Sequence, residues 1–172
     1  MAILLALTSA ARAHELATLD LTFLSEKEES WEFALGVHVK QSRPNHPSRK
    51  IYLPAYSENK NLCVVHTLRE YRKRTEWIRH SSRLLLAIVA PHAPVSSQTI
   101  SRWVRSTLSS AGISSTFTAH STRSASTSAA AEAGLSLDDI LEAADWASAG
   151  TFRTFYQRPR SRGVFANLVV SL

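Results

Sequence analysis

The chain has 172 residues, of which 44% are hydrophobic and 20% charged, a composition that predicts one compact globular domain rather than two. Its single cysteine, Cys63, excludes an intramolecular disulfide and a zinc site built from cysteines. The 20 lysines and arginines outnumber the 14 aspartates and glutamates, so the formal net charge of +6 favours an anionic partner such as nucleic acid.

Nothing in the sequence points to a membrane. No segment approaches the roughly 18 consecutive apolar residues of a membrane span. The apolar stretch after Met1 lacks the basic residues that open a signal peptide. We therefore expect an intracellular protein.

The first third of the chain predicts a helix followed by a hairpin. Apolar residues recur at helical spacing over residues 2–19, which predicts the first helix. After a charged turn at residues 25–30, the alternation over residues 31–39 predicts a strand that ends at Lys40. Residues 50–56 predict its partner strand, so the two strands form a hairpin with a basic tip.

The rest of the chain is mainly helical. Residues 61–80 predict a helix with one apolar and one basic face. Residues 84–89 predict a short buried strand or extended segment. A further helix begins at the Ser96 cap and ends at Gly112. Three final helical stretches are predicted at about residues 120–133, 137–145 and 149–157.

The main candidate catalytic residues are basic residues and one tyrosine. Arg12 and Glu15 lie three residues apart, as do His120 and Arg123, so each pair shares one face of a predicted helix. The chain has no Gly-rich phosphate loop, no G-x-S-x-G motif and no H-E-x-x-H motif. The remaining histidines lack the spacing of metal ligands, so no metal site is predicted.

The order of these residues resembles the catalytic domain of the tyrosine recombinases. The resemblance covers residues 2–160, and the stretches 144–146 and 155–159 are most similar to recombinases of eukaryotic mobile elements of the DIRS or Crypton kind. In chain order, the matching features are Arg12 and Glu15 as R-x-x-E-L, Lys40 after the strand, His120 and Arg123 as H-x-x-R, Gly134, Trp146 and Tyr156.

The resemblance implies an α+β fold that is mainly helical, with a small antiparallel sheet. It also implies site-specific DNA recombination or integration, in which a strand is cleaved and rejoined through a 3′-phosphotyrosyl intermediate without a metal or cofactor. Tyr156 is then the nucleophile, Arg12 and Arg123 bind the phosphate, Lys40 protonates the leaving 5′-oxygen, His120 and Trp146 assist, and Glu15 orients Arg12 or His120. The expected DNA contacts are Arg43, Ser97, Gln98, Arg102 and Arg105.

The same resemblance implies a domain plan and partners. Residues 1–160 are expected to form the catalytic domain, without the N-terminal core-binding domain of family members. Residues 161–172 are expected to form a tail that docks on a neighbouring protomer. The partners would be duplex DNA and further copies of the chain, as a dimer or tetramer, in the nucleus of a eukaryote or otherwise in the cytoplasm or nucleoid.

Other interpretations stay open at this point. Arg12 and Glu15 also fit an ordinary surface pair, which contributes under about 1 kcal/mol. Tyr156 also fits a packing aromatic, and Arg43, Arg49 and Lys50 crowd the hairpin beside Lys40. As a whole, the chain also fits a catalytically silent, truncated or domesticated DNA-binding remnant of a mobile element. It fits a helical protein-interaction module as well.

Overall fold

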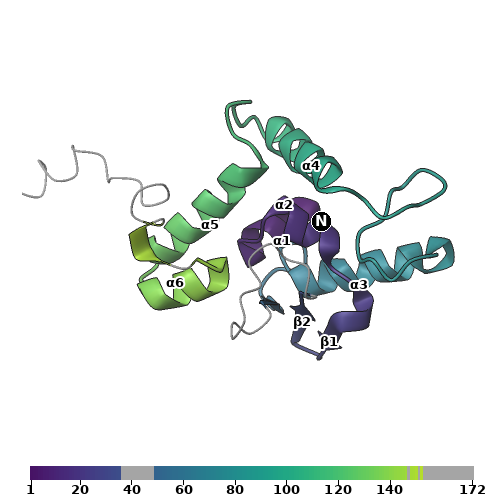
Figure 1. The fold of residues 1–172 in the computed structure, drawn as a ribbon, viewed down its shortest axis with the longest axis horizontal. Helices are drawn as coiled ribbons and strands as arrows, with labels where there is room; N and C mark the ends of the chain where they lie inside the picture. Colours follow the sequence, from purple (N-terminus) through teal and green to yellow (C-terminus); the bar gives the residue numbers. More distant parts are fainter. Residues whose placement is uncertain (36–48, 147, 151, 153–172) are drawn as a thin grey trace, which may run out of the picture.

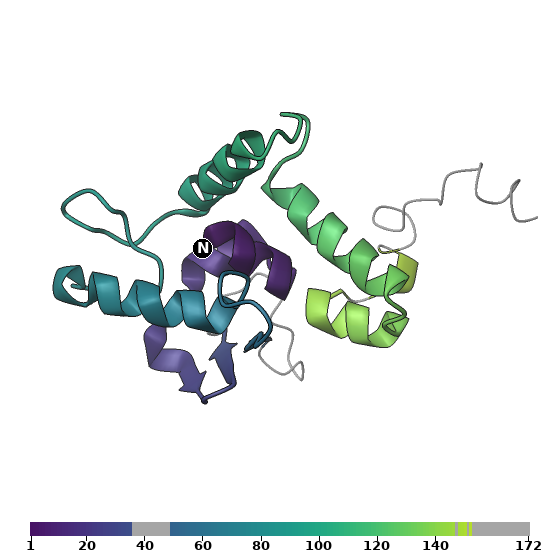
Figure 2. The ribbon, with the colours of Figure 1, turned by 180° about the vertical axis from the view of Figure 1, so that it is seen from behind.

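The computed structural model describes residues 1–35, 49–146, 148–150 and 152. In this part of the chain, the structure is mostly helical with a small antiparallel sheet, as the sequence predicts. Figures 1 and 2 show the first two helices in the middle of the molecule, with α3 on one side and α5 and α6 on the other. The predicted site residues Lys40, Arg43 and Tyr156 and the tail at 161–172 lie outside the described residues.

The N-terminal segment is two helices, so the prediction of one helix over residues 2–19 is wrong. Helix α1 (Ala2–Ser9) ends because Ala10 adopts a left-handed conformation with φ 47°. The Ser9 hydroxyl donates to the Leu5 carbonyl at 2.6 Å and accepts from the Ala11 N–H at 3.2 Å. It thus takes the place of backbone partners at the end of the helix. Helix α2 (Ala13–Thr18) then begins after Arg12. The break places Arg12 at the start of a new helix.

The sheet contains one strand more than the sequence predicts. Strands β1 (Leu24–Glu26), β2 (Ser30–Ala34) and β3 (Lys50–Pro54) pair antiparallel in the order β1-β2-β3. The segment predicted as a charged turn therefore contains part of a short edge strand, on which Glu26 is exposed. The predicted strand over residues 31–39 is described only as far as residue 35.

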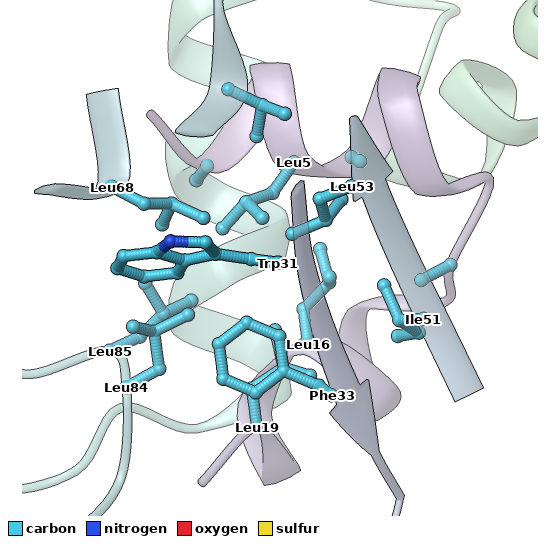
Figure 3. Close-up of a cluster of buried hydrophobic side chains, with 14 of the residues drawn as sticks. Leu5, Leu16, Leu19, Trp31, Phe33, Ile51, Leu53, Leu68, Leu84 and Leu85 are labelled. Carbon is cyan, nitrogen blue, oxygen red and sulfur yellow. The ribbon is translucent and has the colours of Figure 1, made fainter. Parts of the chain in front are cut away.

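Alternating side chains of the sheet form one side of the core. Trp31 and Phe33 on β2 are fully buried opposite Leu53 and Ile51 on β3. Figure 3 shows the Trp31 indole between Leu68 on one side and Leu84 and Leu85 on the other. Leu5, Leu16 and Leu19 from α1, α2 and the segment after α2 complete this cluster.

The apolar face predicted within residues 61–80 is confirmed. Helix α3 (Val64–Thr75) buries Val64, Val65 and Leu68, and a 3₁₀ turn η2 (Glu76–Ile78) follows it. The predicted buried segment at residues 84–89 is right only for Leu84–Leu86. Ile88 and Val89 are 82% and 78% exposed, because the chain turns outward there and returns at the bridge between Leu86 and Pro94.

The cap predicted at Ser96 is confirmed, and two further helices follow α4. Helix α4 (Ser97–Ser110) begins where the Ser96 hydroxyl accepts the Thr99 N–H at 3.2 Å. Helix α5 (Ala119–Glu132) follows, and α6 (Leu137–Ala144) packs on α5 over a second small core around Ile140 and Phe152. Of the predicted helix over residues 149–157, only residues 149, 150 and 152 are described, and they are helical.

None of the described helices has the length and apolar composition needed to cross a membrane.

Candidate active site

The starts of three helices meet at one hollow of about 300 Å³. Figure 1 shows α2 below α4 and the N-terminal end of α5, so residues far apart in the sequence come together there. The residues that line the hollow come from the start of α2, the first turn of α4 and the start of α5: Ala11, Arg12, Ala13, His14, Ser97, Ser101, Ala119, His120 and Arg123.

The first part of the site is a buried carboxylate held between two arginines. Glu15 is fully buried, and its Oε1 contacts Arg12 Nη1 at 3.0 Å. Its Oε2 accepts the backbone N–H of Arg12 at 2.5 Å and forms an ion pair with Arg49 Nη1 at 2.6 Å. Burial alone would raise the pKa of Glu15, yet Arg49 and the Arg12 N–H outweigh burial and hold the pKa below its usual value. Glu15 is therefore a carboxylate at neutral pH.

Arg123 lies at the bottom of the hollow and is itself buried. Its Nη1 donates to the Ala10 carbonyl at 2.7 Å, and its Nη2 donates to the Ala144 carbonyl. The Cζ atom lies 4.7 Å from the centroid of the Trp146 ring, which packs against Phe152. The left-handed turn at Ala10 and the end of α6 thus orient this guanidinium.

His120 stands at the mouth of the hollow on the first turn of α5, where it is exposed. The pKa of His120 is lowered, first because its surroundings displace water from the ring and then because Arg123 and Arg12 lie nearby. The imidazole is therefore neutral at pH 7 in the free protein, and a bound anion would reverse the effect of the two arginines.

The electrostatics of the hollow favour an anion with several oxygen atoms. Among its described lining residues, two are arginines, two are histidines and none is acidic. The one buried carboxylate nearby, Glu15, is already paired with two arginines. Helices α4 and α5 also begin at the hollow, so the positive ends of their dipoles face it. A phosphate group fits this charge and this forked set of donors.

The structure brings together most of the predicted site residues within the described ranges. Trp146 lies under Arg123, and Ser97 lines the hollow. Gln98, Arg102 and Arg105 are exposed on α4. Within the same ranges, no cluster of three or more His, Cys, Asp or Glu side chains is placed to hold a metal ion.

Sequence reasoning did not select three residues that belong to this region. His14 and Ser101 line the hollow, and Arg49 is the second partner of Glu15. The sequence shows Arg49 only as one of several basic residues around the hairpin. No local signal separates it from the other basic residues of this segment, because its burial depends on contacts with α2 and α6.

Solved DNA recombinases have the same fold as this chain. The XerA recombinase superposes with a TM-score of 0.71 at 18% identity, over 99% of this chain and 54% of that chain. The XerH site-specific recombinase, in a post-cleavage complex with its palindromic difH substrate, gives 0.71 at 16% identity over 97% of this chain and 43% of that one. A lambda integrase dimer bound to a COC′ core site gives 0.58 at 19% identity, over 94% of this chain and 52% of that chain.

The fold is therefore that of the tyrosine recombinase catalytic domain, and the chain spans about half the length of these solved relatives. The model of the phage integrase family matches residues 1–162, and the chain belongs to that family. A comparison with curated proteins gives no match.

Proposed function

We propose that the chain catalyses site-specific DNA recombination by cleaving and rejoining strands through a covalent bond to Tyr156. The observation that carries this proposal is the hollow in which Arg12, His120 and Arg123 meet without an acidic neighbour on the lining. Membership in the phage integrase family supports the same conclusion.

In the proposed reaction, the Tyr156 hydroxyl attacks a DNA phosphodiester. The bond between its oxygen and phosphorus forms, the bond from phosphorus to the 5′-oxygen breaks, and the product is a 3′-phosphotyrosyl link with a free 5′-hydroxyl. The phenol, with an ordinary pKa near 10, loses its proton as it attacks, and Lys40 gives a proton to the leaving oxygen. The covalent link conserves the energy of the broken bond for rejoining, so no cofactor is required.

Arg12 and Arg123 supply the transition-state stabilisation in this proposal. Charge builds on the non-bridging oxygens of the five-coordinate phosphorus, and two guanidinium groups meet it with donors placed before the reaction. Glu15 holds Arg12, and Trp146 supports Arg123. His120 donates to a phosphate oxygen once the anion has raised its pKa.

The partners in this proposal are duplex DNA and further copies of the chain. The exposed side chains of Gln98, Arg102 and Arg105 on α4, together with Ser97 and Arg43, would contact the duplex. The lambda integrase relative is a dimer on its DNA, and a dimer or tetramer is proposed here, with residues 161–172 docking between protomers. We also propose an origin in a DIRS or Crypton-like mobile element, from the stretches 144–146 and 155–159, and hence a nuclear site of action.

A covalent-trapping assay tests the activity. The protein is incubated in EDTA with nicked suicide duplexes of mixed sequence and denatured, and the DNA-linked band is quantified. We expect an adduct that Tyr156→Phe abolishes and that Tyr52→Phe, at an exposed tyrosine on β3, leaves unchanged. Salt-sensitive DNA binding without an adduct would instead identify a catalytically silent remnant. If the protein neither binds DNA nor forms an adduct, the result would identify an interaction module.

A further inference from the structure

We propose that Arg49 is a positioning residue that holds Arg12, the base of the hairpin and the end of α6 in one arrangement. The inference rests on the proposed function, because it assigns a role within that site. Arg49 is not part of the lining of the hollow, so it acts on the phosphate only through its neighbours.

The first observation is that Arg49 links two segments through its side chain. Nη1 forms the 2.6 Å ion pair with Glu15 of α2, and Nη2 donates to the Ala143 carbonyl at the end of α6 at 2.9 Å. The side chain is only 8% exposed. Its own carbonyl accepts the Leu35 N–H at 2.9 Å, which closes the ladder between β2 and β3. Arg49 therefore stands directly before β3 and pairs with the residue that follows β2.

The second observation is the arrangement of charges around Glu15. This carboxylate carries Arg12 on one oxygen and both Arg49 and the Arg12 N–H on the other. If Arg49 were absent, Arg12 would be the only described charged partner left on a fully buried carboxylate, and burial would favour its neutral form. A neutral Glu15 holds a guanidinium much less firmly, so the geometry of Arg12 depends on Arg49.

The third observation concerns the end of α6. The carbonyls of the adjacent residues Ala143 and Ala144 accept from Arg49 and Arg123 respectively. Helix α6 otherwise packs mainly on α5, which carries Arg123, so the bond from Arg49 attaches the C-terminal end of α6 to the start of β3. Trp146 follows directly, and the segment that carries Tyr156 comes next in the chain. One arginine thus connects the start of β3 with the helix that follows Arg12 and with the end of α6.

Stability alone does not explain this arrangement. A buried ion pair loses the hydration of both charges, so replacing it with apolar side chains is often neutral or favourable. The ion pair between Glu15 and Arg49 also fixes the position of Arg12, which an apolar pair would not do. At metal sites, residues that orient a ligand through a hydrogen bond typically change affinity or activity 10- to 100-fold when they are removed, and we expect an effect of the same order here.

The test compares Arg49→Met, Arg49→Lys, Glu15→Gln and the double variant Arg49→Met with Glu15→Gln. The matched control is Arg72→Met, because Arg72 forms an ion pair of the same 2.6 Å length with Glu26, but at the surface. Adduct formation is measured at saturating suicide duplex, and DNA affinity is measured separately. All measurements are made below the melting temperature of each variant.

We expect Arg49→Met to slow adduct formation by about 10- to 100-fold and to change DNA affinity by less than about threefold. Arg49→Lys should recover part of the rate, because an ammonium group can pair with Glu15 but cannot also reach Ala143. In the Glu15→Gln background, Arg49→Met should slow adduct formation by less than about twofold. The inference would be overturned if Arg49→Met slowed adduct formation as much in the Glu15→Gln background as in the parent protein. It would also be overturned if Arg49→Met and Arg72→Met formed adduct at the same rate.

A second measurement does not depend on cleavage. Spectra of protein labelled with ¹⁵N-arginine report the guanidinium of Arg12, with its signal assigned through Arg12→Lys. We expect slow guanidinium rotation in the parent protein and fast rotation in Arg49→Met. If the Arg12 signal is unchanged, the inference is wrong even where the protein cleaves DNA. If the signal changes and no adduct forms in the parent protein, the proposed function fails and the positioning role stands.

Discussion

The guanidinium of Arg123 stacks on the indole of Trp146, with 4.7 Å between Cζ and the ring centroid. The same guanidinium donates to the carbonyls of Ala10 and Ala144. A residue of the H-x-x-R box is thus held by a turn near the N-terminus and by the end of α6. The orientation of Arg123 consequently depends on how α6 is placed.

Removing the Trp146 ring should destabilise the C-terminal part of the protein. Trp146→Ala removes the contact with Arg123 and the packing against Phe152, and we expect a loss of about 2 kcal/mol in the free energy of unfolding. Urea denaturation measures it. Trp77→Ala is the control, because Trp77 is 81% exposed, and it should change stability by about 0.5 kcal/mol or less. An equal loss of stability in both variants would contradict the packing role of Trp146.

Replacing Arg123 should affect both stability and activity. Arg123→Met leaves the carbonyls of Ala10 and Ala144 without this donor, and we expect a loss of about 2 kcal/mol. Adduct formation should fall at least about 100-fold, since a preorganised donor to the phosphate is lost. The exposed Arg105 on α4 provides the comparison for stability, because Arg105→Met should unfold at the same urea concentration as the parent protein.

The buried Glu15 should make stability depend on pH in the acidic range. Its pKa in the folded protein is lowered, so its contribution is complete above the unfolded value of about 4.3 and is lost as the pH falls through the folded value. At neutral pH, Glu15→Gln leaves Arg49 without its buried partner and should cost about 3 kcal/mol. The difference from the parent protein should shrink on acidification. Glu32→Gln, at a surface pair with Lys50, should show neither effect.

DNA affinity should rise on acidification through His120. The pKa of His120 is lowered in the free protein, and a bound phosphodiester would raise it, so binding takes up a proton. Between about pH 7.5 and about pH 5.5 we expect an increase of about fivefold in affinity, measured by fluorescence anisotropy at constant salt. His120→Gln should flatten this dependence, whereas His66→Gln, at an exposed site on α3, should retain it. If the DNA affinity of His120→Gln still rises on acidification, a group other than His120 takes up the proton.

The exposed face of α4 should contribute phosphate contacts. For Arg102→Ala, the slope of log affinity against log salt concentration should fall by about 1, because one fewer counterion is released on binding. Arg74→Ala, on α3 and outside the hollow, should leave the slope unchanged. Titrations at several salt concentrations decide between these outcomes, and equal slopes for both variants would remove α4 from the DNA interface.

Local patterns in the sequence determined much of this protein. The apolar face of α3, the Ser96 cap of α4 and the alternation of Trp31 and Phe33 are all set by residues within a few positions of one another. The order of Arg12, Glu15, His120, Arg123 and Trp146 was also readable, because it depends on residue type and spacing alone. These features predicted the fold class and Arg12, His120 and Arg123 at the hollow, but not His14 or Ser101.

Tertiary contacts decided the rest. Ala10 ends α1 in a left-handed turn within an alanine-rich segment whose pattern is helical, and its carbonyl is the one that receives Arg123. The side chain of Arg49 is buried whereas that of the next residue, Lys50, is exposed, because a carboxylate on α2 and a carbonyl at the end of α6 lie within reach of Arg49. Burial of a charged group depends on partners that only folding brings close, and for that reason no local pattern distinguishes Arg49 from a surface arginine.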